Sequence, residues 1–128
     1  MKSLIRMLAA WLLVFGSSAA LALDVKPYTA DAFAKAQRAN RPVALLFHAD
    51  WCPTCRLQQK TIALLQEESG LDDITILKVD YDRDQELRRR MKVRAQSTLI
   101  VYKGKVEKGR SAGVTEIDAL RAALQAAL

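Results

Sequence analysis

Two cysteines carry the reactive chemistry that this sequence offers. Cys52 and Cys55 are the only cysteines in the chain, and Pro53 and Thr54 separate them. A disulfide between them would close a very small loop and remove little entropy from the unfolded chain, so a purely structural bridge is the poorer interpretation. The spacing predicts a redox-active pair that alternates between a dithiol and a Cys52–Cys55 disulfide.

Metal binding is another use for two thiols. A structural zinc site needs four ligands, and the chain adds only a single histidine, His48, to its two cysteines. Two thiolates and an imidazole suit Cu(I), so a copper-binding module stays open as an alternative. No methionine-rich or second histidine-bearing segment supports that alternative, and we expect neither a bound metal nor another cofactor.

A buried strand followed by a helix is expected to position the cysteines. Residues 43–47 form a continuous apolar run, typical of a strand buried on both faces, and the cysteines follow directly. A helix is predicted over residues 53–68, ending before Gly70. The apolar residues expected on its inward side are Leu57, Ile62, Leu64 and Leu65.

Cys52 would then lie at the N-terminus of a helix. Free N–H groups and the positive end of the helix dipole stabilise a thiolate at such a position. Pro53 suits the first helical position and leaves the N–H groups of Thr54 and Cys55 for this task. Cys52 is therefore the predicted nucleophile, and Cys55, one turn further on, is the predicted resolving thiol.

The remaining sequence patterns predict further helices and strands around this unit. Helices are expected over 31–39, over 83–92 and after a cap at Thr115, and strands over 74–79, 98–102 and 106–110. The turn 103–105 joins the last two strands as a hairpin. Because strands that alternate with helices pair in parallel, the expected class is α/β, with a central mixed sheet flanked by helices.

This order, with C-x-x-C opening a helix after a buried strand, resembles the thioredoxin superfamily. The segment 47–55, FHADWCPTC, is similar to its active-site segment, and A-D-W-C is similar to periplasmic thiol reductases, including the C-terminal domain of transmembrane disulfide reductases. Lys78-Val79-Asp80, Val93-Arg94-Ala95 and Thr98-Leu99 are further matches. The resemblance covers roughly residues 26–127 and implies exchange between this pair and protein thiols. The residues expected to support the cysteines are Trp51, Pro53, Thr54 and His48.

The loop before the strand at 98–102 departs from the superfamily pattern. Members usually carry a cis-proline there, facing the cysteines and aligning the backbone of the partner. This chain has Ser97 instead, within the expected docking loop Gln96-Ser97-Thr98. Because a cis bond before a non-proline residue costs about 3–4 kcal/mol, the Gln96–Ser97 bond is predicted to be trans.

Two further departures concern proton transfer. The superfamily's buried Asp and the Lys of the neighbouring strand are expected to be replaced by Leu46 and Ile76, which would leave Cys55 without a buried base. His48 stands at a position that is usually aromatic. Its imidazole could pair with a thiolate, carry a proton or only pack.

The first 22 residues are predicted to be a cleaved signal peptide. Lys2 and Arg6 form a basic region, residues 8–15 an apolar core too short to span a membrane, and Ala20-Leu21-Ala22 a cleavage site. Residues 23–128 then form one exported thioredoxin-like domain, expected in the periplasm. The formal net charge of +6 falls to +4 when the two basic residues leave, which is mild.

The expected function is that of an exported thiol–disulfide oxidoreductase acting on protein thiols and disulfides. The resemblance favours the reductase direction over oxidase or isomerase work, with a membrane electron donor as a candidate partner. A binding module with vestigial cysteines is another alternative, which Ser97 favours. The basic run 88–94 follows acidic residues in a helix, so it predicts a solvated face and no nucleic-acid site, and a monomer is expected.

Overall fold

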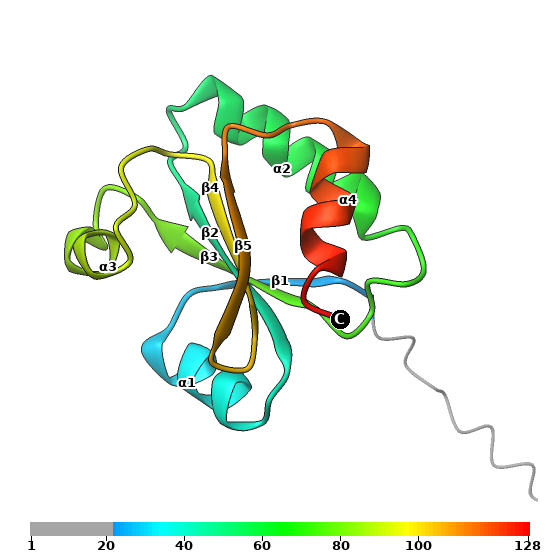
Figure 1. The fold of residues 1–128 in the computed structure, drawn as a ribbon. Coiled ribbons are helices and arrows are strands. Elements are labelled where there is room, and N and C mark those ends of the chain that lie inside the picture. The colour runs from blue at the N-terminus through cyan, green and yellow to red at the C-terminus, as the bar shows by residue number, and fades with distance from the viewer. Residues whose placement is uncertain (1–21) are drawn as a thin grey trace, which may run out of the picture.

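A mixed five-stranded sheet forms the centre of the molecule, in the order β1-β3-β2-β4-β5 (Figure 1). The computed structural model describes residues 22–128, so the predicted signal peptide lies outside it except for Ala22. The strands are β1 (Asp24–Pro27), β2 (Pro42–His48), β3 (Thr75–Asp80), β4 (Thr98–Lys103) and β5 (Val106–Ala112). The helices are α1 (Ala30–Arg38), α2 (Pro53–Leu65), α3 (Gln85–Arg90) and α4 (Ile117–Gln125).

The strand pairing confirms the predicted α/β class. β1, β3 and β2 run parallel, whereas β4 is antiparallel to β2 and β5 to β4. The β4–β5 hairpin turns at Gly104, as predicted, with a φ of +56° that favours glycine. A Cβ at this glycine would stand 2.5 Å from the Asn40 Oδ1 atom, so the turn also has little room for a side chain. Within the described part of the chain, no helix is long and apolar enough to cross a membrane.

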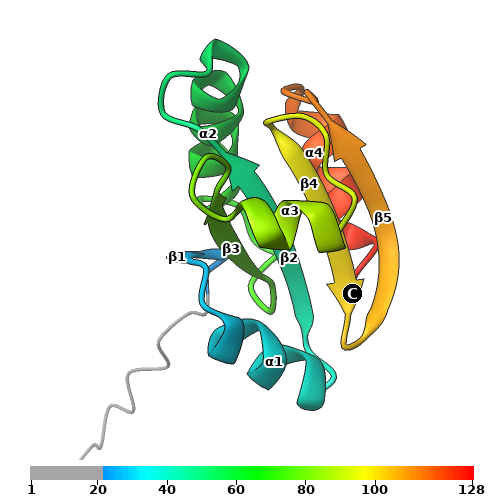
Figure 2. The same cartoon turned by 90° about the vertical axis from the view of Figure 1, so that its left-hand side faces the viewer.

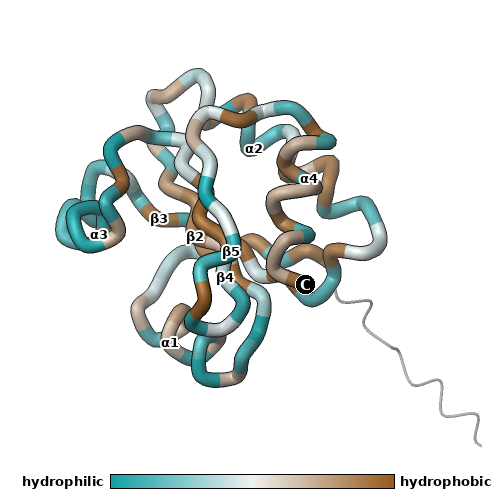
Figure 3. The backbone as a smooth tube through the Cα atoms, viewed as in Figure 1, coloured by the Kyte–Doolittle hydropathy of each residue, from teal (hydrophilic) through white to brown (hydrophobic). Residues whose placement is uncertain are grey.

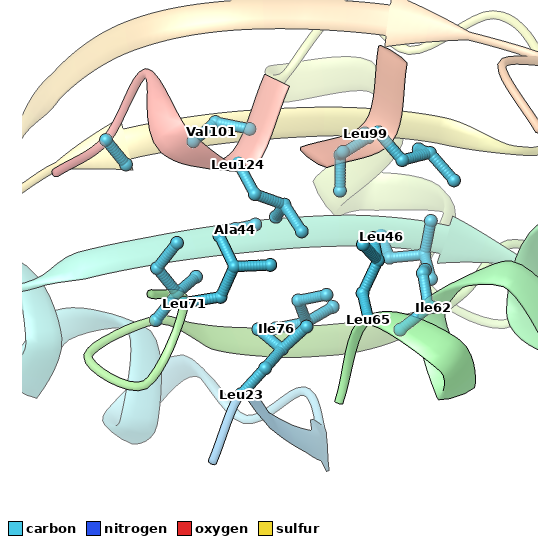
Figure 4. Packing of buried hydrophobic residues seen from close by; sticks show 13 residues of the cluster. Leu23, Ala44, Leu46, Ile62, Leu65, Leu71, Ile76, Leu99, Val101 and Leu124 are labelled. Atoms are coloured by element: carbon cyan, nitrogen blue, oxygen red, sulfur yellow. The ribbon is translucent and has the colours of Figure 1, made fainter. Parts of the chain in front are cut away.

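β2 is apolar from Pro42 to Phe47 because it separates two cores. Ala44 and Leu46 face α2 and α4, whereas Val43, Leu45 and Phe47 face α1 and α3. Figure 2 shows α1 and α3 in front of the sheet, and Figure 4 shows the packing on the opposite side. In Figure 3 the central strands are hydrophobic and α3 is hydrophilic, in keeping with its acidic first turn and basic last turn. This central, fully buried strand ends at His48, shortly before the cysteine segment.

The predicted inward side of α2 is wrong in two positions. Leu57 and Leu64 are 52 % and 59 % exposed, whereas Gln58 and Thr61 are buried together with Ile62 and Leu65. Positions 58, 62 and 65 share one side of a 3.6-residue helix with Cys55, and 57 and 64 fall beside it. The helix also ends at Leu65, three residues earlier than expected.

The ends of the chain's other elements show two more differences. Thr115 does not cap α4: Glu116 is the N-cap, and neither side chain makes a capping hydrogen bond. The Thr115 carbonyl instead accepts a hydrogen bond from Thr61 Oγ1 at 2.8 Å. β1 was not predicted, because four residues ending in proline give too short a pattern for a strand.

Candidate active site

Cys52 forms the N-cap of α2. Its Sγ atom accepts a hydrogen bond from the Cys55 backbone N–H at 3.2 Å, in the way that a serine or aspartate oxygen commonly does at this position. Pro53 occupies the first turn, as predicted, and the Thr54 N–H also bonds to the sulfur. The helix N-terminus therefore contributes two backbone donors to one sulfur atom.

Both cysteines are free thiols, so the structure represents the reduced form of the predicted disulfide pair. Cys52 is 7 % exposed and Cys55 is 1 % exposed. With Ala49 they form a small buried cluster, against which the half-buried Tyr81 packs. The sulfur that is expected to attack a partner is thus the more accessible of the two.

The environment shifts the pKa values of the two thiols in opposite directions. Burial disfavours a charged sulfur at Cys52, but hydrogen bonds from Cys55, Ser97 and Thr54 outweigh it and hold the pKa of this thiol below its ordinary value. For Cys55, burial and the hydrogen bond that its thiol donates to Cys52 raise the pKa. A thiolate therefore forms first on Cys52, which supports its predicted role as the nucleophile.

This difference predicts the order of alkylation of the reduced protein. Over a rising pH series with iodoacetamide, we expect Cys52 to be modified with a midpoint below that of a free cysteine, and Cys55 only well above it. Peptide mapping by mass spectrometry measures both sites in the same sample. In a Cys55→Ala control, the Cys52 midpoint should rise, because the side-chain donor that stabilises the Cys52 thiolate is removed. Equal midpoints at the two sites would contradict the asymmetry.

Ser97 is the third side chain at the sulfurs. Its Oγ atom lies 3.0 Å from Cys55 Sγ and 3.7 Å from Cys52 Sγ, and the residue is 1 % exposed. The Gln96–Ser97 bond is trans, as predicted, and Ser97 has a φ of +59°. Elsewhere in the expected docking loop, Gln96 is half-buried and Thr98 Oγ1 donates to the Ala95 carbonyl at 2.7 Å. Of the three loop residues, Ser97 is the one that hydrogen-bonds the sulfurs.

Gln58 is a site residue that the sequence analysis missed. Its side chain is 1 % exposed, and Nε2 donates to the carbonyls of Ser97 at 3.3 Å and Val114 at 2.9 Å. The available signal was its position three residues after Cys55, which puts both on one side of the helix. A polar residue on that side should have been expected to bond backbone groups near the sulfurs.

His48 and Trp51 lie beside the cysteines without bonding to them. The buried His48 has its Nε2 atom 2.9 Å from Asp50 Oδ1, and no hydrogen bond within residues 22–128 joins it to a sulfur. Trp51 is 59 % exposed, and its Nε1–H donates to Asp82 Oδ2 at 2.7 Å. Both line a hollow of about 460 Å³, together with Lys78. Trp51 is thus a surface residue, as a docking role requires.

The expected replacement of the lysine beneath the sulfurs is wrong in its register. Ile76 pairs with Ala44, and the residue beside Leu46 on β3 is the half-buried Lys78. Paired residues of parallel strands point to the same side of the sheet, so Lys78 shares a face with Leu46. The lysine is therefore present in this strand, and Leu46, which is 2 % exposed, is the apolar member of the pair.

The three groups considered for Cu(I) do not converge. Cys52 and Cys55 are adjacent, but His48 bonds to Asp50. Across residues 22–128, no cluster of three or more His, Cys, Asp or Glu side chains is arranged to hold a metal. The structure thus gives the copper alternative only two of its proposed ligands.

Comparisons with known proteins agree with this geometry. A sequence model described as thioredoxin matches residues 24–126. Thioredoxin from Coprinus comatus is 29 % identical over 92 residues, which cover 70 % of this chain and 87 % of that protein. Thioredoxin 2 from Plasmodium falciparum is 36 % identical over 66 residues, 52 % of this chain, and the chain spans only 41 % of its length. The crystal structure of Trxlp from Edwardsiella tarda has a TM-score of 0.75 at 36 % identity, over 79 % of this chain and 98 % of that one.

Proposed function

Because the chain belongs to the thioredoxin family of thiol–disulfide oxidoreductases, we propose that it is an exported member that reduces disulfides of other proteins in the periplasm. The observation that carries the proposal is the unequal pair at the start of α2. Cys52 is the N-cap with a lowered pKa, and Cys55 is the buried thiol with a raised one. Such a pair has one sulfur suited to attack and one suited to resolution.

The chemistry needs two exchange steps. The Cys52 thiolate attacks a partner disulfide, forming a mixed disulfide and releasing the first partner sulfur as a thiolate that takes up a proton. Cys55 then loses its proton and attacks Cys52 Sγ, and the second partner sulfur leaves as a thiol. The partner gains two electrons and two protons, and the Cys52–Cys55 disulfide is left behind.

The docking role of the loop before β4 belongs to the same proposal. Ser97 stands where the family resemblance expects a cis-proline, and its loop lies directly against the cysteines. Trp51 directly precedes Cys52 in the chain and is exposed. A partner segment that reaches Cys52 would therefore be expected to contact Trp51 and the backbone around Gln96.

Export is supported by the sequence pattern of residues 1–22 and by the position of the cleavage point. Cleavage after Ala22 would leave Leu23, which is 1 % exposed in the core, and all of β1 in the mature protein. The reductase direction rests on the resemblance of A-D-W-C to periplasmic reductases. In an oxidising compartment it requires a membrane donor that returns electrons to the pair.

The proposal is tested on protein purified from a periplasmic fraction, whose first residue is expected to be Leu23. Titration against dithiol buffers, read by thiol alkylation, should show one reversible two-electron couple that involves Cys52 and Cys55. The same sample should accelerate insulin reduction by dithiothreitol, and a Cys52→Ala variant should not. A pair that resists excess dithiol would instead identify a redox-inactive binding module. A Cys52→Ala variant as active as the original would show that the Cys52–Cys55 pair does not carry the activity.

A further inference from the structure

A basic surface lies next to the cysteines, and Tyr81 connects the two. We propose that Arg88 and Arg94 form an interaction surface for a carboxylate of the partner protein, on an acidic residue a few positions from the partner's reactive cysteine. This inference rests on the proposed function and names the class of disulfide that the same site prefers.

Tyr81 directly follows β3 and contacts both the cysteines and the loop between α3 and β4. Its ring packs against the buried cluster of Ala49, Cys52 and Cys55. Its hydroxyl donates a hydrogen bond to the Arg94 carbonyl at 3.2 Å. Arg94 is exposed and belongs to the loop that runs from α3 to the start of β4 (Figure 2). The segment that carries this arginine is therefore held beside the reactive pair.

The guanidinium group of Arg88 stacks on the same tyrosine. Its central carbon lies 3.8 Å from the centroid of the Tyr81 ring, a cation–π contact that fixes an otherwise flexible side chain. Its Nε atom is buried without a hydrogen-bond partner. The donors left for a ligand are the two terminal amino groups, which match the two oxygens of a carboxylate. Because the side chain is already ordered, binding such a group costs little further entropy.

The neighbouring carboxylates leave both arginines without a counter-charge. Asp84 stands four residues before Arg88, a spacing that suits a helical ion pair, but the two side chains form none. Two other carboxylates of this segment are engaged, Asp82 by an indole N–H and Glu86 by Arg90. Within residues 22–128, no carboxylate forms an ion pair with either arginine of the proposed surface. Their charge is therefore available to an acidic group of another molecule.

A partner segment that reaches Cys52 passes close to this surface. Extended backbone advances about 3.3 Å per residue, so a side chain about two to four positions from the partner cysteine can reach a group that lies one tyrosine ring away. An acidic residue there would pair with Arg88, and Arg94 would add to the attraction. At the edge of a docking site, such charges act mainly on the rate of encounter and on the choice of partner. The preferred substrates are therefore disulfides with an acidic residue nearby in the chain.

The experiment compares three disulfide-linked peptide dimers that differ only in one residue near the cysteine, which is Glu, Gln or Lys. Reduced protein is mixed with each peptide at low salt, and rapid acid quenching followed by alkylation measures the rate of exchange. Each rate constant is divided by that of the same peptide with dithiothreitol, which corrects for intrinsic reactivity. The corrected constants should fall in the order Glu, Gln, Lys, with about tenfold between first and last. In about 1 M NaCl this ratio should fall to about twofold, because salt screens exposed charges.

Charge reversal distinguishes recognition from structural support. Arg88→Glu should lower the ratio of the Glu rate to the Lys rate to about one, and Arg88→Glu/Arg94→Glu should invert it. Arg88→Lys keeps the charge without the planar group and should keep the order, with a ratio of about threefold. A merely structural role would slow all three peptides equally. Each ratio compares substrates of one protein, so a loss of folded protein cancels.

Arg89→Glu is the matched control on the same helix. Arg89 is exposed, and its replacement changes the net charge as much as Arg88→Glu does, but Arg88 is the residue that stacks on Tyr81. The control should keep at least about half of the original ratio. Equal rates for the three peptides with the original protein, or equal effects of the two single reversals, would overturn this surface and leave the proposed function intact. If the original reduced protein reacts with none of the peptides, the proposed function fails, and this inference fails with it.

Discussion

Replacing Cys52 by serine is expected to reduce insulin reduction by about a thousandfold or more, because a serine hydroxyl is a weak nucleophile at neutral pH. Cys55→Ser is expected to be equally inactive over many turnovers, but for a different reason. Its Cys52 keeps the N–H donors of Thr54 and Cys55 and can still attack. The mixed disulfide then persists, because no thiol remains to resolve it.

Trapping in the periplasm measures this difference directly. Cells expressing Cys55→Ser should yield adducts with partner proteins on non-reducing gels, which mass spectrometry identifies and which reductant releases. Cys52→Ser and the double variant Cys52→Ser/Cys55→Ser are the matched controls and should trap nothing. Adducts on Cys55 in the Cys52→Ser variant, at a yield equal to that of Cys55→Ser, would contradict the assignment of nucleophile and resolving thiol.

The parts of the site that the sequence predicts correctly are those fixed by local rules. The apolar run 43–47, the turn at Gly104 and the start of α2 at Pro53 each depend on residues within a few positions. Proline favours the first position of a helix, so a cysteine that follows a buried strand and directly precedes such a proline is expected to be the N-cap. The nucleophile could therefore be assigned before its surroundings were known.

The residues that surround the sulfurs come from distant parts of the chain. Ser97 and Cys55 are 42 positions apart, and Gln58 and Val114 are 56 apart. Ser97 was recognised as a departure from the family pattern, but its contacts depend on how β4 pairs with β2. The inward side of α2 was assigned from leucines, and polar residues whose partners are distant carbonyls carry no apolar signal. Strand register has the same difficulty, because a shift from Ile76 to Lys78 changes no local pattern.

A second large effect is expected on stability, from placing a charged group at position 46, which lies beside Lys78 on the neighbouring strand. Leu46→Asp places a carboxyl group where the side chain is 2 % exposed, packed among apolar residues between the sheet and α2. Leu46→Asn is the matched control, with nearly the same shape and no titration. The lost apolar packing and the buried polar group should lower the free energy of unfolding by about 3 kcal/mol in both variants at acidic pH.

The two variants should separate as the pH rises. Burial raises the pKa of the introduced carboxyl above its value in the unfolded chain, so the folded state favours the protonated form. The protonated carboxyl therefore carries no penalty from ionisation while the pH is below its pKa in the unfolded chain. Stability is lost as the pH rises from that value through the pKa of the carboxyl in the folded protein. A shift of about two units would make Leu46→Asp less stable than Leu46→Asn by about 2.7 kcal/mol at pH 8. Urea unfolding followed by circular dichroism at pH 3.5 and pH 8 measures the difference, since pH 3.5 lies below the unfolded pKa of the carboxyl group.

The contrary result would have a specific physical meaning. Lys78 lies beside position 46 on the same face of the sheet, and its ammonium group would favour an ionised carboxylate if it reached that group. The free energy of unfolding of Leu46→Asp at pH 8 would then equal or exceed that of Leu46→Asn. We expect Leu46→Asp to be the less stable variant at pH 8, because removing two charges from water commonly costs more free energy than their attraction provides. A Leu46→Asp/Lys78→Met variant provides the check: it should lose no more stability with rising pH than Leu46→Asp alone.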